Sequence, residues 1–146
     1  MSTIPEYMTS KHRECDEIFV EAESAVAKQD WVLAQEKWNS FSNELALHLE
    51  AEETMLFPQF EQATGITSGP TQVMRMEHEQ MRVLVGDLTN ALQAQDKDGY
   101  LGLSETLMVL MQQHNMKEEM MLYPMSQQHI ADSETLTQNL QEHCQN

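Results

Sequence analysis

Residues 48–58 read HLEAEETMLFP, and residues 114–124 read HNMKEEMMLYP. Aligned without a gap, the two segments are identical at six of eleven positions, with an offset of 66 residues (114 minus 48). The same offset carries His12 onto His78, so the chain contains twice a lone histidine followed 36 residues later by a His-x-x-x-Glu pair. Because four residues are roughly one turn of an α-helix, the His and Glu of each pair point the same way.

The spacing of apolar residues around these pairs predicts helices throughout. The expected helices are residues 10–28, a long helix from Trp31 (N-capped by Asp30) to a break at 63–70, a third from Pro70 or Thr71, a fourth after a turn at 96–99, and a short tail from Ser133 to about His143. Their apolar stripes are Met8, His12, Cys15, Phe19, Ala22 and Val26; Ala34, Trp38, Phe41, Leu45, His48, Glu52 and Met55; Met74, His78, Met81, Val85, Leu88 and Leu92; Leu103, Leu107, Met111, His114, Glu118, Met121 and Met125. Steps of three and four predict an all-α four-helix bundle with a short C-terminal helix.

Composition limits the class of protein. A chain of 146 residues predicts one domain over residues 1–146. The net charge of −16 argues against nucleic acid or an anionic membrane as a partner, and no run approaches the roughly 18 apolar residues of a membrane span. Without a secretory signal or CxxC spacing, Cys15 and Cys144 are expected to be reduced thiols in a cytoplasmic protein.

Six polar residues fall on core positions of the four stripes. They are His12, His48, Glu52, His78, His114 and Glu118. A buried carboxylate without a partner costs several kcal/mol, and two divalent or trivalent cations would compensate both while accepting the imidazole lone pairs. Taken singly, each residue is better explained as a hydrogen-bonded core side chain or an i,i+4 surface pair. Their recurrence in phase, at one offset, favours a dinuclear metal site of iron or manganese, with zinc tolerated.

Several neighbours of these six residues attract a second interpretation. Cys15 could lie near the site but is expected to be a core residue, and Asp16 could orient His12 or be solvated. Most of the acidic neighbours and the histidines outside the repeat are expected at the surface: Glu53, Glu77, Glu79, Glu119, His129 and His143. Tyr7 and Tyr123 are candidate phenols beside the site, although the alignment of Tyr123 with Phe57 favours packing.

These residues resemble the hemerythrin-like (HHE cation-binding) family over nearly the whole chain. The resemblance rests on His12, the His48–Glu52 pair with Leu56-Phe57-Pro58, the Glu77-His78 step, and the His114–Glu118 pair with Leu122-Tyr123-Pro124. It implies an up-down-up-down bundle holding a non-heme di-iron centre, with two iron ions that are oxo- or hydroxo-bridged when oxidised. By resemblance, Glu52 and Glu118 bridge the irons and the four histidines are terminal ligands.

The sequence departs from the oxygen-carrying members of that family. They have a further histidine four residues after the first in the third helix, where this chain has Arg82, and an aspartate where this chain has Glu119. The pattern is more similar to a four-His, two-Glu branch linked to the nitric-oxide response and to repair of iron centres. Fewer protein ligands imply more open positions on iron.

The resemblance therefore implies a protein, monomeric or weakly homo-oligomeric, that binds O₂, NO or peroxide at open iron positions. The alternative is a di-iron enzyme or iron donor in nitrosative or oxidative stress, which reduces NO or peroxide or repairs iron centres. Iron storage or a purely structural metal is a third class. No phosphate loop or nucleophile constellation indicates another reaction, and whether the chain is an enzyme stays open.

Overall fold

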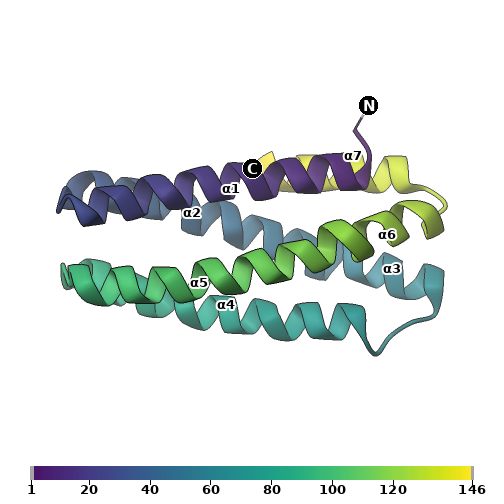
Figure 1. The fold of residues 1–146 in the computed structure, drawn as a ribbon. Helices are drawn as coiled ribbons and strands as arrows, with labels where there is room; N and C mark the ends of the chain where they lie inside the picture. The colour runs from purple at the N-terminus through teal and green to yellow at the C-terminus, as the bar shows by residue number, and fades with distance from the viewer. Residues whose placement is uncertain (1, 146) are drawn as a thin grey trace.

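The computed structural model describes residues 2–145, which form an all-α, up-down-up-down four-helix bundle with a short C-terminal helix (Figure 1). The elements are α1 (Ile4–Ala27), α2 (Trp31–Ala51), the π-helical turn η1 (Glu52–Leu56), α3 (Phe57–Thr64), α4 (Pro70–Gln93), α5 (Lys97–Lys117), the π-helical turn η2 (Glu118–Leu122), α6 (Tyr123–His129) and α7 (Ser133–Gln145). The second long helix is α2, η1 and α3 in direct succession, and the fourth is α5, η2 and α6.

The two short connections at one end of the bundle are built alike. Gln29 and Gln95 have positive φ values of 58° and 54°, and the aspartate after each caps the following helix. The side chain of Asp96 accepts a hydrogen bond from the Gly99 amide at 3.0 Å. The predicted turn at 96–99 is therefore wrong beyond Asp96, because this cap begins α5 at Lys97.

The first helix also begins earlier than predicted, at Ile4 rather than near residue 10. The Thr3 hydroxyl accepts the Glu6 amide at 3.3 Å, and Pro5 suits the first turn because its missing N–H is not needed there. The tail helix α7 covers the predicted segment and packs against α1 and α2. As a result His143 is half-buried, contrary to the prediction, whereas His129 is exposed.

The two π-helical turns change the predicted stripes. The predicted stripe of the second long helix includes Met55, and that of the fourth includes Met121. In the structure, Met121 is 44% exposed and Met55 is only half-buried. The Phe57 amide donates to the Glu52 carbonyl and the Tyr123 amide to the Glu118 carbonyl, in each case five residues back.

The cause of each π turn is the proline that follows it. Pro58 and Pro124 have no N–H, and their rings would clash with the carbonyl four residues back in a regular helix. A π turn takes up one extra residue, so the residue five positions after the glutamate returns to the glutamate's face. Tyr123 and Phe57 are therefore buried where Met121 and Met55 were predicted.

Two apolar clusters fill the bundle, and the six polar residues lie between them along each long helix. The first cluster, toward the connections after α1 and α4, includes Phe19, Trp38, Phe41, Leu88, Tyr100 and Leu107. The second, toward α3, α6 and α7, includes Ile4, Met8, Phe57, Phe60, Leu122, Leu136 and Leu140. None of the helices within residues 2–145 combines the length and apolar composition that a bilayer span requires.

Replacing Asp96 tests whether this cap stabilises the bundle. Asp96→Ala should cost about 1 kcal/mol and lower Tm by about 3 °C, because the Gly99 amide loses its acceptor. Asp96→Asn, which keeps a side-chain oxygen, should melt close to the wild type. Thermal unfolding followed by circular dichroism measures both. An Ala variant that melts with the wild type would show that this cap does not contribute.

Candidate metal centre

The structure brings all six predicted residues together in two overlapping sets. The first set is His12, His48, Glu52 and Glu118; the second is Glu52, His78, His114 and Glu118. Within each set, one nitrogen or oxygen atom per residue lies within 4.8 Å of all the others. All six side chains are buried, and the two carboxylates shared by the sets are fully buried.

The histidines direct Nε2 toward the shared carboxylates. His12 Nε2 lies 3.1 Å from Glu118 Oε1, and His114 Nε2 lies 3.3 Å from the same atom. His48 Nε2 lies 3.5 Å from Glu52 Oε2, whereas His78 Nε2 lies 3.1 Å from Glu52 Oε1. Glu52 thus offers one oxygen to the histidine of each set.

The outward nitrogens of three histidines are held by carboxylates. His12 Nδ1 is 2.6 Å from Glu119 Oε2, and His78 Nδ1 is 2.6 Å from Glu53 Oε2. The Nδ1 atom of His114 is 2.9 Å from an oxygen of Glu77. A carboxylate behind an imidazole fixes its tautomer and orientation, so these contacts direct the Nε2 lone pairs inward.

The prediction that most acidic neighbours lie at the surface is wrong for Glu77, which is buried, whereas Glu53 and Glu119 are half-buried. A residue next to one of the six points about 100° away from it, and here that direction leads to a histidine of a neighbouring helix as well as toward solvent. A signal was present in the repeat, since the Glu-Glu doublets at 52–53 and 118–119 recur at the same offset. Glu79 does lie exposed and pairs with Arg82 at 2.7 Å.

Two of these three glutamates also form ion pairs with a basic side chain nearer the surface. Arg82 pairs with Glu53 at 2.9 Å, and Lys117 pairs with Glu77 at 2.6 Å. Burial raises the pKa of Glu53, but the hydrogen bonds from Arg82 and His78 outweigh it and lower the pKa below its usual value. Arg82 therefore holds a carboxylate behind a histidine. The prediction that Asp16 could orient His12 fails, because Glu119 holds that nitrogen.

His48 lacks such a support. Its Nδ1 atom is buried and has no hydrogen-bond partner among residues 2–145. The repeat places Lys11 where the other half has Glu77 (77 minus 66), and Lys11 instead pairs with Glu14 at 2.9 Å and Glu44 at 3.3 Å. The two halves of the centre are therefore alike in their inner atoms and different behind them.

Of the two candidate phenols, Tyr123 lies at the centre, although its alignment with Phe57 favoured packing. Its hydroxyl donates to Glu52 Oε2 at 2.6 Å and also lies 2.9 Å from Glu118 Oε1. The phenol oxygen is 3.0 Å from His12 Nε2 and 3.4 Å from His48 Nε2. Burial and the Glu118 and Glu52 carboxylates raise the pKa of Tyr123 well above its usual value.

The counterparts of this phenol carry no oxygen into the centre. Phe57, the equivalent residue in the other half, packs its ring 5.5 Å from the ring of His78. Tyr7, the other predicted phenol, packs against the second apolar cluster, and its hydroxyl bonds none of the six residues. The π turn before Tyr123 explains its position, because it returns residue 123 to the face of Glu118.

The donor atoms fit a metal ion. Four buried atoms of the second set lie close together without a well-aligned hydrogen bond in the described chain: Glu52 Oε1, His78 Nε2, His114 Nε2 and Glu118 Oε2. The two nitrogens contact carboxylate oxygens at 3.1 and 3.3 Å, but neither contact has hydrogen-bond geometry. Buried polar atoms are seldom left unpartnered, so four at one point indicate a cation. They come from the residues of the second set, whereas the corresponding atoms of the first set contact the Tyr123 hydroxyl.

Without an ion, the centre binds protons. Burial lowers the pKa of His12, but Glu118 and Glu119 outweigh it and raise the pKa to about 10. Burial also lowers the pKa of His114, but Glu118 outweighs it and raises the pKa to about 9. Burial raises the pKa of Glu52, but the charge of His48 and hydrogen bonds hold it well below its usual value. A metal must therefore displace protons from the imidazoles.

A small enclosed void touches the centre on the side of the first apolar cluster. Its volume is about 10 Å³, which is space for roughly one water molecule. The residues around it are His12, Cys15, Leu45, His48, Leu49, Met81, Met111, His114 and Asn115. Cys15 is thus both a core residue and a neighbour of the site, and the void is mostly apolar.

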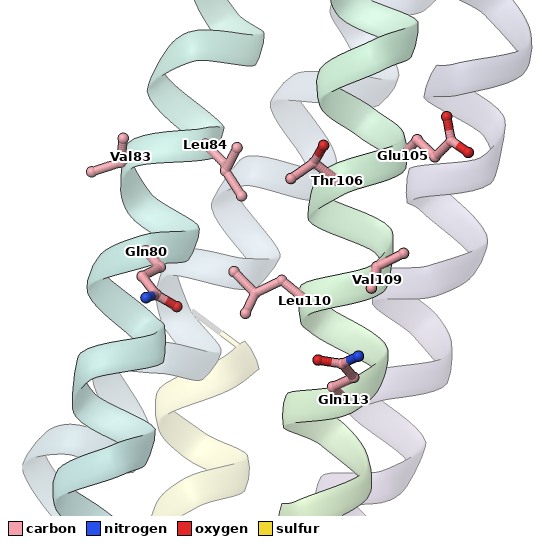
Figure 2. Close-up of a pocket in the computed structure, with 8 residues that line it drawn as sticks. All are labelled: Gln80, Val83, Leu84, Glu105, Thr106, Val109, Leu110 and Gln113. Carbon is pink, nitrogen blue, oxygen red and sulfur yellow. The ribbon is translucent and has the colours of Figure 1, made fainter.

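A larger hollow lies elsewhere, on the outer face between α4 and α5 (Figure 2). Its volume is about 710 Å³, and its walls are Gln80, Val83, Leu84, Glu105, Thr106, Val109, Leu110 and Gln113. It contains none of the six residues and no cluster of titratable groups. Among the described residues, the groups of His, Cys, Asp or Glu side chains that could hold a metal are the two overlapping sets at the buried centre.

The comparisons with known proteins agree with this geometry. The family model described as Hemerythrin HHE cation binding domain matches residues 3–126. That span contains all six residues and Tyr123. Neither a curated protein nor a solved structure matches the chain.

Replacing Glu119 tests the support behind His12. In the metal-free protein, Glu119→Gln should lower the pKa of His12 from about 10 toward 6.5, because an amide keeps a hydrogen-bond acceptor but carries no charge. Imidazole resonances followed by NMR across a pH titration measure this shift. The exposed control Glu79→Gln should leave the pKa of His12 unchanged. If the pKa of His12 in Glu119→Gln equals that of the wild type, Glu119 does not support His12.

The same shift has a consequence for stability. Since the folded pKa of His12 exceeds its unfolded value of about 6.5, the stabilisation from its charged form is complete below pH 6.5 and is lost as the pH rises through about 10. The Tm difference between wild type and Glu119→Gln should therefore be larger at pH 6 than at pH 10. An opposite trend would mean that His12 is neutral in the metal-free fold.

Proposed function

Because this chain belongs to the hemerythrin HHE cation-binding family, we propose that it is a non-heme di-iron protein that binds a small ligand such as O₂ or NO at open iron positions. The observation that carries the proposal is the convergence of four unpartnered buried donor atoms beside a void the size of one water molecule. A cation explains the first feature, and a diatomic ligand fits the second.

The proposed ligands divide between two ions. His12 and His48 would hold one ion, His78 and His114 the other, and Glu52 and Glu118 would contact both. Iron bound there would supply coordination positions for a diatomic or peroxide and an exchange between ferrous and ferric states. The two carboxylates would offset part of the ionic charge inside the bundle.

The remaining residues prepare the site for that role. Carboxylates of Glu53, Glu77 and Glu119 hold the Nδ1 atoms, so three imidazoles present Nε2 without reorganising. The apolar clusters on either side keep bulk water away from the carboxylates. The small void on the side of the first apolar cluster favours a small ligand over a larger substrate.

The donor chemistry favours iron over copper or a thiolate-bound zinc. The six residues supply imidazole and carboxylate, which suit iron and manganese, and no thiolate. The one thiol beside the void is Cys15, and burial raises its pKa to about 12. It belongs to neither of the two sets of converging donor atoms.

A second candidate function is catalysis, either the reduction of NO or peroxide or the repair of iron centres. The feature that favours a reduction is the Tyr123 O–H, a proton donor among the donor atoms of the first set. Carriage and catalysis differ in stoichiometry, because a binder consumes at most one ligand per site and an enzyme consumes many. Peroxide or NO consumption by the iron-loaded protein with a reductant separates the two.

Metal loading tests the ligand assignment. Iron-loaded wild type should retain about two irons per chain after desalting. His48→Ala removes a ligand of the first set only and His114→Ala one of the second, so each should lose about one iron. Colorimetric iron analysis with a check of helicity measures the loss.

A matched control and a contradicting result complete this test. His129→Ala removes an exposed histidine outside both sets and should retain both irons. If the His48→Ala/His114→Ala double variant retains both irons, the six residues are not the ligands.

Reaction with gases tests the functional class. The diferrous protein mixed with O₂ should oxidise to the diferric state instead of forming a long-lived oxygenated form, because Arg82 pairs with Glu53 and supplies no further ligand. NO should bind the diferrous protein readily. Stopped-flow absorbance follows both reactions. A stable adduct that releases O₂ under argon would make the protein an oxygen carrier.

A further inference from the structure

We propose that the phenol oxygen of Tyr123 is a fifth protein ligand of the ion in the first set, so that the two metal positions differ in their chemistry. The second ion keeps four protein ligands. This inference rests on the proposed function, since it requires ions at both sets. It stands on the position of one oxygen atom and on the difference between Tyr123 and Phe57.

The first observation is the distance from the phenol oxygen to each donor atom of the first set. These distances are 2.6, 2.9, 3.0 and 3.4 Å to Glu52 Oε2, Glu118 Oε1, His12 Nε2 and His48 Nε2. In an octahedral shell with bonds of about 2.1 Å, adjacent ligand atoms lie about 3.0 Å apart, which is the bond length times the square root of two. The phenol oxygen lies within 0.4 Å of that spacing from all four atoms, which is consistent with a fifth ligand.

The second observation is that the hydroxyl contacts nothing else. Its hydrogen-bond partners in residues 2–145 are the four donor atoms of the first set. An ion bound to those atoms would take up the lone pair of each imidazole and one lone pair of each carboxylate oxygen. The side chain is fully buried, so the hydroxyl would then have only the ion or an ion-bound carboxylate oxygen as its partner.

The third observation is the contrast between the two sets. Donor atoms of the second set are left without partners, and the residue equivalent to Tyr123 there is Phe57. Both side chains follow a π turn that returns residue five to the face of the bridging glutamate. The π turn is therefore present in both halves, and the hydroxyl is the difference between Tyr123 and Phe57 at the ions.

Coordination of the phenol oxygen to the ion needs no oxidant, reductant or other reactant. The O–H bond breaks, an oxygen–iron bond forms, and the proton leaves to water. The first ion then has one fewer position for an exchangeable ligand than the second. The proposed gas ligand would therefore have more open positions at the ion held by His78 and His114.

Spectroscopy of the ferric protein tests the proposal. Phenolate bound to ferric iron gives a charge-transfer absorption in the visible and enhanced phenolate vibrations in resonance Raman spectra. Wild type loaded with two ferric ions should show both, and Tyr123→Phe should lose them while retaining iron. With Zn²⁺, which is redox-inactive, the wild type should show a tyrosinate difference absorption in the ultraviolet that Tyr123→Phe lacks.

The repeat supplies matched variants. Phe57→Tyr places a second hydroxyl at the equivalent position and should increase the charge-transfer band, and the Phe57→Tyr/Tyr123→Phe exchange should retain one band. Tyr100→Phe changes a buried phenol of the first apolar cluster and should leave the band unchanged. Since phenylalanine already occupies the equivalent position 57, Tyr123→Phe is expected to fold.

The outcomes separate this inference from the proposed function. A wild type that holds two ferric ions without a phenolate band, or a band that persists in Tyr123→Phe, overturns the role of Tyr123 alone. Tighter ion binding by Tyr123→Phe in the absence of a wild-type band would show that the hydroxyl blocks the first set. A wild type that binds no iron overturns both proposals.

Discussion

The burial of two carboxylates is the constraint on which the rest of the structure depends. Glu52 and Glu118 have no exposed surface, yet they lie in the middle of a helical bundle. Their charge is met by imidazoles from all four long helices, which is possible only if those helices converge at one level. The apolar clusters on either side, and the glutamates behind the histidines, are arranged around that level.

Helical periodicity was sufficient to predict the bundle and the residues at its centre, because both depend on the face of a single helix. It could not decide between the site and packing for Tyr123, because a π turn before Pro124 adds a residue and brings residue 123 to the core in place of Met121. The periodicity also placed Glu119 at the surface. It gives the direction in which a side chain leaves its own helix, but not which other helix lies in that direction. That direction leads to His12, 107 residues away in the sequence.

The two sides of the centre along the bundle axis are different environments. On one side lie the aromatic rings that follow the π turns, and Tyr123 brings an O–H into contact with the carboxylates. On the other side lies a small void with Cys15, Met81 and Met111 in its wall. A ligand in that void meets an apolar surface and three imidazoles, so the phenol oxygen and the space for a ligand lie on opposite sides of the centre.

The crossed pairing of the two halves has a consequence for symmetry. Glu53 of the first half supports His78 of the second, and Glu119 supports His12 in return, as in an isologous dimer. In a true dimer of identical halves, every substitution would appear twice and the two metal positions would remain equal. A continuous chain lifts that restriction, so a hydroxyl can be present at Tyr123 and absent at Phe57. Covalent continuity thus permits one half to specialise while the other is held constant.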